Sequence, residues 1–342
     1  MYGSTMALSH ILLTGTRREI GLTQGRRIRA LRLPPLSAGD RAFGQECRSL
    51  ASRWHVAMCE EFDGMLEASG LPADRFTSYY FGRTAPFAGG CTNIAVVADG
   101  AEECATLVGR NYDWAYADRR WCEARLIAPK GEVRRIGYTH HWGGLCDVMN
   151  EHGLTLCIAS LPITATVRPG LQWHIVADLI AATCRTALEA ADLLRRIPHL
   201  RSLGYLVADG RTARLVEASA EGVVVHEPED GILVGTNHRL GSHPAPGEHG
   251  HASAVRRARA LELLQPRAGH LTLHDIRRAL SDHEGGICAG AHGSVSGLSA
   301  SGTIWSLLAE PAKKLMRVAP GHPCETPFET IPWPQENAPA TG

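Results

Sequence analysis

The sequence predicts an α+β fold in which two antiparallel β-sheets are covered by helices. After Cys91 the chain consists largely of short apolar runs, and turn signals such as Asp99-Gly100 and Lys130-Gly131 separate them. Close spacing and tight turns favour antiparallel pairing of these runs. The runs form two blocks that are interleaved with helical periodicity, a pattern typical of two sheets with helices on their faces.

The N-terminal part of the chain has a helical pattern of apolar residues in place of short apolar runs. Apolar side chains recur at helical spacing within 45–69, and Gly70 is a signal for the end of a helix. We therefore expect residues 1–90 to be a mostly helical segment and residues 91–342 to form the main domain.

The remaining elements follow in order along the main domain. Helical periodicity predicts helices at 172–196, 252–264 and 271–283, the last with Thr272 as its N-cap. The tail from Pro320 is rich in proline and is predicted to be an extended coil. The predicted strands are 92–98, 104–110, 122–128, 133–139, 145–150, 154–160, 204–209, 213–218, 222–226, 232–236, 303–309 and 314–318.

Composition excludes several classes of function. Its 35 basic and 35 acidic side chains balance, which argues against a nucleic-acid-binding protein. No stretch approaches the roughly 20 apolar residues of a membrane helix, so we expect no membrane association. The ten cysteines are scattered without a Cys-x-x-Cys pair. We therefore predict a reducing, cytoplasmic location and no metal site.

Cys91 is a candidate nucleophile because it directly follows a glycine pair that ends at Gly90. A cysteine nucleophile needs a base to supply its thiolate. If the chain were cut before Cys91, the new α-amino group, with an ordinary pKa of about 7.7–8.0, would serve as that base. Glycine at the scissile bond permits strained backbone and close approach. The alternative is a buried structural cysteine, the commoner role of a cysteine taken alone.

A polar motif, Gly109-Arg110-Asn111-Tyr112-Asp113-Trp114, ends the next strand. By alternation Asn111 and Asp113 share one face of that strand, and Arg110 lies on the other. The carboxylate could orient an ammonium or thiol group, and Arg110 could hold a carboxylate or a substrate anion. The alternative is a surface ion pair.

These motifs, with two more, resemble the N-terminal-nucleophile cysteine hydrolases. Within that group the chain is similar to the isopenicillin-N (penicillin) acyltransferases and, more distantly, to the bile-salt hydrolases. The resemblance implies an αββα four-layer sandwich, autocatalytic cleavage before the cysteine, and chemistry at a linear amide or thioester carbonyl. The motifs are Gly90-Cys91-Thr92, Gly109 to Trp114, Asn150-Glu151-His152-Gly153-Leu154 and Thr236-Asn237-His238.

By position, the resemblance assigns catalytic roles. Cys91 matches the nucleophile, with the cleavage site between Gly90 and Cys91. Arg110 and Asp113 match the polar pair of the active site. Asn237 matches the asparagine whose amide helps form the oxyanion hole, a contribution on the order of 3 kcal/mol. Taken alone, Asn237 would be interpreted as a turn residue.

The chain departs from the family pattern at two positions. Ser160 stands where bile-salt hydrolases have an asparagine, and a hydroxyl donates one hydrogen bond with a different reach. The family also tends to place an arginine after a late Ile-Cys pair, whereas Ile287-Cys288 is followed by Ala289. We expect Asn111 and Ser160 to contact the substrate.

The expected function is that of a self-processing enzyme that forms an acyl-thioester at Cys91 and transfers the acyl group to a small-molecule amine, as in antibiotic biosynthesis. The substrate would be an amide or thioester, with acyl-CoA as a suitable co-substrate and no other cofactor. The processed chains are expected to stay associated. One alternative is a linear-amide hydrolase that uses water, and another is a non-catalytic binding relative.

Overall fold

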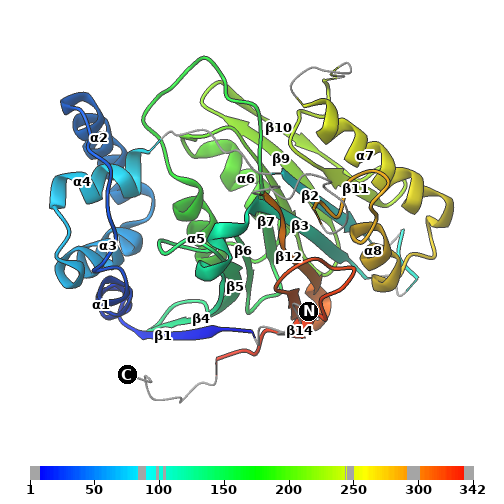
Figure 1. Ribbon diagram of the computed structural model, residues 1–342, viewed down its shortest axis with the longest axis horizontal. Helices are drawn as coiled ribbons and strands as arrows, with labels where there is room; N and C mark the ends of the chain where they lie inside the picture. The colour runs from blue at the N-terminus through cyan, green and yellow to red at the C-terminus, as the bar shows by residue number, and fades with distance from the viewer. Residues whose placement is uncertain are drawn as a thin grey trace.

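Two β-sheets lie face to face at the centre of the computed structural model (Figure 1). Helices cover the outer face of each sheet, so the layers run helix, sheet, sheet, helix. This arrangement confirms the predicted α+β fold with four αββα layers. The structure describes residues 8–83, 90–97, 100–102, 105–242, 244, 250–290 and 301–334.

The larger sheet has eight strands in the order β1-β4-β5-β6-β7-β8-β9-β10. The pair β1–β4 is parallel, and the other neighbouring strands are antiparallel, as the tight turns predict. These strands are β1 (His10–Gly15), β4 (Glu123–Pro129), β5 (Arg135–Thr139), β6 (Asp147–Asn150), β7 (Thr155–Ser160), β8 (Leu203–Ala208), β9 (Ala213–Ser219) and β10 (Gly222–His226).

The smaller sheet has six antiparallel strands in the order β11-β2-β3-β12-β13-β14. Its register sets Gly90 opposite Asp113 and Cys91 opposite Tyr112. The two polar motifs of the sequence therefore meet on neighbouring central strands. These strands are β2 (Gly90–Val96), β3 (Leu107–Ala115), β11 (Ile232–Gly235), β12 (Ser301–Glu310), β13 (Leu315–Ala319) and β14 (Glu329–Thr330).

Two pairs of helices form the outer layers. Helices α5 (Trp173–Thr183) and α6 (Ala187–Arg196) pack on the larger sheet, whereas α7 (His251–Leu264) and α8 (Leu273–Leu280) pack on the smaller one. Thr272 caps α8, as predicted, and accepts a hydrogen bond from the backbone of the third residue of that helix. None of the helices in the described ranges is both long and apolar enough to cross a membrane.

The N-terminal helices gather at one end of the molecule, opposite α7 and α8 (Figure 1). Helices α1 and α3 cross closely because their contact contains glycines. A Cβ atom at Gly21 would lie only 1.9 Å from the carbonyl oxygen of Glu61. These helices are α1 (Arg17–Arg27), α2 (Ala38–Trp54), α3 (Val56–Ser69) and α4 (Ala73–Thr77), and α4 continues into a π-helical turn over Ser78–Gly82.

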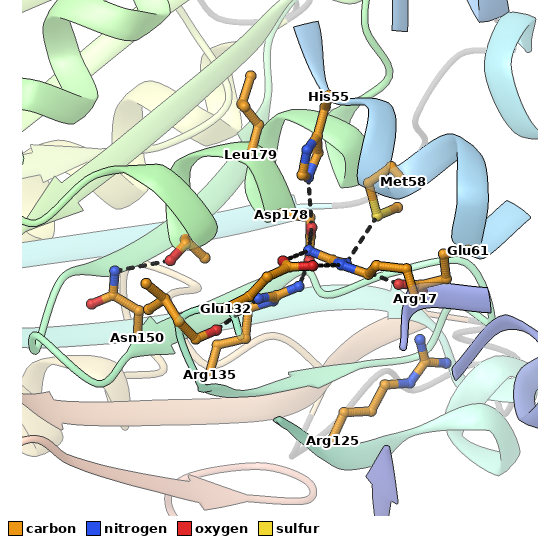
Figure 2. Close-up of polar contacts among 12 residues, drawn as sticks. Arg17, His55, Met58, Glu61, Arg125, Glu132, Arg135, Asn150, Asp178 and Leu179 are labelled. Atoms are coloured by element: carbon orange, nitrogen blue, oxygen red, sulfur yellow. Dashed lines mark hydrogen bonds and ion pairs between the residues drawn. The ribbon is translucent and has the colours of Figure 1, made fainter. Parts of the chain in front are cut away.

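A buried charge cluster joins these helices to the rest of the molecule (Figure 2). We call it the Arg17 cluster, and it comprises Arg17, Glu61, Glu132, Arg135 and Asp178. Arg17 of α1 donates to Glu61 of α3 at 2.9 Å and to Asp178 of α5 at 2.9 Å. Its Nε also donates to Glu132 at 2.8 Å, and Arg135 of β5 pairs with Asp178 at 2.7 Å. The first 90 residues are therefore held to the sandwich by ion pairs as well as by apolar contacts.

The N-terminal segment differs from its prediction in two ways. The single helix expected at 45–69 is two helices, α2 and α3, because the backbone at His55 is not helical (φ −152°, ψ 72°). The segment also contributes strand β1 to the edge of the larger sheet and the helix α1, neither of which was predicted. Its described residues therefore include four α-helices and one strand of the sandwich.

Candidate active site

Cys91 lies at the start of β2, and its side chain faces the space between the two sheets. The residue is 4% exposed. Its thiol opens into a narrow cavity whose walls are mostly apolar and come from β2, β3, β7, β8 and α5. The described residues that line this cavity, called here the Cys91 cavity, are Cys91, Tyr112, Trp114, Cys146, Ile158, Ser160, Trp173 and Leu203.

Arg110 supplies a fixed positive charge beside the thiol. It is fully buried, and its Nη2 lies 3.5 Å from the sulfur of Cys91 and donates to the carbonyl oxygen of Ile158 at 2.5 Å. Its Nη1 pairs with the carboxylate of Asp147, which also accepts a hydrogen bond from the indole of Trp305 at 2.7 Å. A guanidinium held in this way favours the thiolate form of the neighbouring cysteine. The motifs predicted Arg110 near Cys91 but contained no signal for Asp147.

Asp113 lies beside the bond that precedes Cys91. A Cβ atom at Gly90 would stand 2.7 Å from the Oδ2 of Asp113, so only glycine leaves room for this carboxylate. Asp113 accepts a hydrogen bond from the hydroxyl of Thr303 at 2.7 Å. Burial raises the pKa of Asp113 above its ordinary value, although the charge of Arg256 and the Thr303 hydrogen bond act in the opposite direction.

Asn237 connects the backbone of Cys91 to its surroundings. Its Oδ1 accepts hydrogen bonds from the backbone N–H of Cys91 at 2.6 Å and from the guanidinium of Arg256 at 2.7 Å. Its Nδ2 donates to the backbone oxygen of Ser160 at 2.9 Å and to its hydroxyl at 3.0 Å. The two groups that donate to Oδ1 and the two oxygens that accept from Nδ2 fix the orientation of the Asn237 amide.

This orientation relates Ser160 to the predicted oxyanion site. The amide N–H of Asn237 points at the Ser160 hydroxyl, and Ser160 lines the same cavity as Cys91. A substrate carbonyl oxygen that replaced this hydroxyl as acceptor would receive the same N–H. The geometry thus suits both the donor role predicted for Asn237 and the substrate contact predicted for Ser160.

Asn111, for which a substrate contact was expected, lies away from the Cys91 cavity in this structure. Its amide donates at 2.8 Å to the carbonyl oxygen of Leu280 and at 2.8 Å to that of Ile287. The residue is fully buried on the face of β3 that packs against α8, away from the Cys91 cavity. Alternation correctly placed Asn111 on the face opposite Arg110, and that face is occupied by a helix.

Arg256 is a residue of the site that the sequence analysis missed. It lies on α7, and its guanidinium contacts Asn237 and acts on the charge of Asp113. Ala289, where the family pattern has an arginine, offers no charge, so α7 supplies a cation to this region instead. The arginine-rich face of the helix predicted at 252–264 was the available signal.

A larger cavity of about 540 Å³ adjoins the Cys91 cavity, because Trp114 and Trp173 line both. We call it the arginine vestibule. Burial, with a smaller contribution from the neighbouring charge of Arg83, lowers the pKa of Arg201 to about 10. Burial lowers the pKa of His174 to about 3, so that ring is neutral at pH 7. Among the described lining residues, the charged ones are Arg27, Arg32, Arg83, Arg120, Arg201 and Asp118.

Comparisons with known structures agree with the fold. The chain is similar to a Caenorhabditis elegans ortholog of N-acylethanolamine-hydrolyzing acid amidase, at 14% identity and a TM-score of 0.50, over 71% of this chain and 100% of that one. It is also similar to a mutant of conjugated bile acid hydrolase from Clostridium perfringens, at 13% identity and a TM-score of 0.45, over 71% and 97% of the two chains. Penicillin V acylase from Agrobacterium tumefaciens gives 16% identity and a TM-score of 0.46, over 67% and 83%.

The sequence itself identifies the family. None of the curated proteins matches the sequence. The model of the family described as "Acyl-coenzyme A:6-aminopenicillanic acid acyl-transferase" matches residues 100–325, a range that begins after Cys91 and includes Arg110, Asp113 and Asn237. This match covers more than half of the chain. The chain is therefore an enzyme that belongs to the acyl-coenzyme A:6-aminopenicillanic acid acyl-transferase family.

Proposed function

We propose that this enzyme is a self-processing cysteine acyltransferase whose nucleophile is Cys91. One observation carries the proposal: the Cys91 thiol lies 3.5 Å from the buried guanidinium of Arg110, while the Cys91 N–H is bonded to Asn237. A cation beside the sulfur and a polar amide beside the reacting backbone are what thiol chemistry at an acyl group requires.

The first step would be cleavage of the Gly90–Cys91 bond. The thiol of Cys91 attacks the carbonyl carbon of Gly90, a C–S bond forms, and the C–N bond breaks as the thiol proton passes to the leaving nitrogen. Water then hydrolyses this thioester, which leaves a carboxylate on Gly90 and restores the thiol. Asp113, next to Gly90, is placed to hold the new ammonium group of Cys91.

The processed enzyme would then work on an exogenous acyl group. The free α-amine of Cys91 accepts the thiol proton, and the thiolate attacks the carbonyl carbon of the donor. The donor's thiol or amine leaves with that proton, and the acyl group stays on Cys91 as a thioester. A small-molecule amine attacks this thioester and loses a proton, and the thiol of Cys91 is regenerated.

The two adjoining cavities favour an anionic thioester donor such as acyl-CoA. The Cys91 cavity is narrow and apolar, which suits an acyl chain. The arginine vestibule begins at the same two tryptophans, Trp114 and Trp173, and offers five arginines against one carboxylate among its described lining residues. Guanidinium groups are well suited to bind phosphate oxygens. A donor that spans both cavities would place its thioester next to Cys91.

Water competes with the amine for the same acyl-enzyme, so a linear-amide hydrolase is the second candidate function. We also propose a setting in small-molecule metabolism, such as antibiotic biosynthesis, in the cytoplasm. The nine cysteines in the part of the chain that the structure describes are free thiols, which suits a reducing compartment.

The test is to incubate purified enzyme with an acyl-CoA and with the acyl N-acetylcysteamine thioester, each with and without 6-aminopenicillanic acid as amine. We expect amide product to increase with amine concentration at the expense of free acid. Arg83→Gln should raise KM for acyl-CoA about tenfold, the value of a hydrogen bond to a charged group, and leave KM for the short thioester unchanged. Arg211→Gln, an exposed arginine outside the vestibule, is the matched control.

Two results would contradict the proposal. Free acid as the sole product at every amine concentration would make the enzyme a hydrolase. An equal effect of Arg83→Gln on both thioesters would show that the arginine vestibule does not bind the phosphate-bearing part of the donor.

A further inference from the structure

A second group of reactive side chains is linked to Asp113 through Thr303 and Ala289. His283 and Cys288 come from the segment that follows α8, and Cys324 comes from the turn that follows β13. One ligand atom from each of these three residues can be chosen so that all three atoms lie within 4.8 Å of one another. The two cysteines are not spaced as a Cys-x-x-Cys pair, so the sequence does not predict this group as a metal site.

The separation of the two sulfurs fits a shared metal ion. The Sγ atoms of Cys288 and Cys324 lie 3.7 Å apart. A disulfide would need about 2.05 Å. Two thiolates on one tetrahedral zinc ion, each at about 2.3 Å from the metal, lie about 3.8 Å apart. The pair is therefore spaced as metal ligands are.

A second histidine lies next to this group. The Nδ1 of His322 is 3.9 Å from the sulfur of Cys288, and its Nε2 is 3.3 Å from the hydroxyl of Tyr116. His322 is not one of the three residues whose ligand atoms all lie within 4.8 Å of one another, so it is a hydrogen-bonding neighbour of Cys288 and not a member of the group. Such a neighbour orients a metal ligand.

We propose that His283, Cys288 and Cys324 bind a zinc-class divalent ion, with the fourth coordination position left to water. Two cysteines and one histidine are a ligand set known for zinc. Binding converts both thiols to thiolates and releases two protons, so affinity should increase with pH.

The ion would brace the segment that supports Asp113. The carbonyl oxygen of Ile287 accepts the amide of Asn111, and the N–H of Ala289 donates to the hydroxyl of Thr303 at 3.0 Å. That hydroxyl in turn donates to Asp113. Cys288 lies between these two anchor points, so a metal bound there would fix the position of the carboxylate without touching the substrate.

The experiment measures metal binding by the full-length protein, purified under reducing conditions and stripped with a chelator. Zinc is returned in a titration against a chromophoric chelator, and Co²⁺ is used to detect thiolate ligation through its charge-transfer absorption. We expect one ion per chain. Cys324→Ser should weaken the charge-transfer band, because one of the two thiolate ligands is lost. His283→Ala, an exposed position that should fold, should weaken zinc binding by more than the roughly 10- to 100-fold that loss of an outer-shell partner costs. Cys59→Ser, at a buried free cysteine in α3, is the matched control.

Three results would overturn the proposal. The first is a wild-type protein that binds no zinc tightly after reduction. The second is an intact mass that shows a Cys288–Cys324 disulfide in the protein as purified without metal. The third is zinc binding that survives in both Cys324→Ser and His283→Ala with unchanged affinity.

Discussion

Arg256 and Asp113 are opposite charges that act on each other near the bond that we propose is cut. Arg256 reaches Asn237 from α7, and Asp113 lies against Gly90 on β2. Burial raises the pKa of Asp113, and the positive charge of Arg256 counters part of that effect. The acid must be ionised to hold the ammonium group of a processed Cys91, so Arg256 acts as a positioning residue through Asp113.

This pair gives a prediction for the pH dependence of activity. Removal of a cation near an acid raises the pKa of that acid. In Arg256→Met, the acidic limb of the pH profile of kcat/KM should therefore move to higher pH by on the order of one unit, because Asp113 then loses its proton at a higher pH. Arg256→Lys, which keeps the charge, should restore the limb toward its original position. A limb that stays in place in Arg256→Met, or moves equally in both variants, would contradict this role.

Some residues of the site could be predicted from motifs along the chain, and others could not. Cys91, Arg110 and Asn237 were placed together by motif, and the structure brings them into contact. Asp147 and Arg256 come from β6 and α7, whose contacts with the site depend on how two sheets and a helix stack. Such contacts leave no local pattern in the chain.

At the scale of elements, α1, α3 and α5 are linked by the Arg17 cluster. Burial alone would raise the pKa of Asp178, but the charges of Arg135 and Arg17 and the hydrogen bond with His55 hold it well below its usual value. A carboxyl with a lowered pKa contributes stability above its unfolded pKa of about 3.9, and that contribution is lost only as the pH falls toward the folded value. The cluster should therefore hold the N-terminal helices at mildly acidic pH.

Loss of this carboxylate should be costly. Asp178→Asn leaves Arg17 and Arg135 buried without their shared partner, which should lower the free energy of unfolding by about 3–5 kcal/mol. Asp192→Asn, at an exposed ion pair with Arg195, should change it by less than about 0.5 kcal/mol. Urea unfolding at pH 7, with Cys91→Ala in both variants to keep the chain uncut, measures the two values. Equal losses would mean that the cluster does not stabilise the fold.

The elements that the sequence did not predict share a physical cause. Helix α1 buries Arg17, Gln24 and two glycines, so it lacks the apolar period that marks a helix. Strand β1 is an edge strand with mostly half-buried residues, and its parallel pairing with β4 joins distant parts of the chain. The predicted strands of the main domain match the observed ones to within five residues, because each is apolar and bounded by turns. Strand β14 (Glu329–Thr330) was not predicted, because it lies in the proline-rich tail that was expected to be an extended coil.

At the scale of the whole molecule, the segment before Cys91 contributes to the larger cavity. Arg32, Tyr79 and Arg83 line the arginine vestibule from the N-terminal side, and Trp114 and Trp173 line it from the sandwich. A chain cut before Cys91 would therefore need both products to keep this cavity intact. The Arg17 cluster and the pairing of β1 with β4 are the contacts that would hold them together.

Mass spectrometry of the full-length protein, before and after incubation with an acyl thioester, measures both the cleavage before Cys91 and the acylation of its thiol. The proposed mechanism at Cys91 predicts two chains, residues 1–90 and 91–342, with the acyl group on Cys91 of the second chain. Cys91→Ala should stay uncut and unacylated, whereas Cys146→Ala, which changes another thiol of the same cavity, should be cut and acylated like the wild type. A wild-type chain that remains unbroken after long incubation and carries no acyl group on Cys91 would contradict the proposal that Cys91 is a self-processing nucleophile.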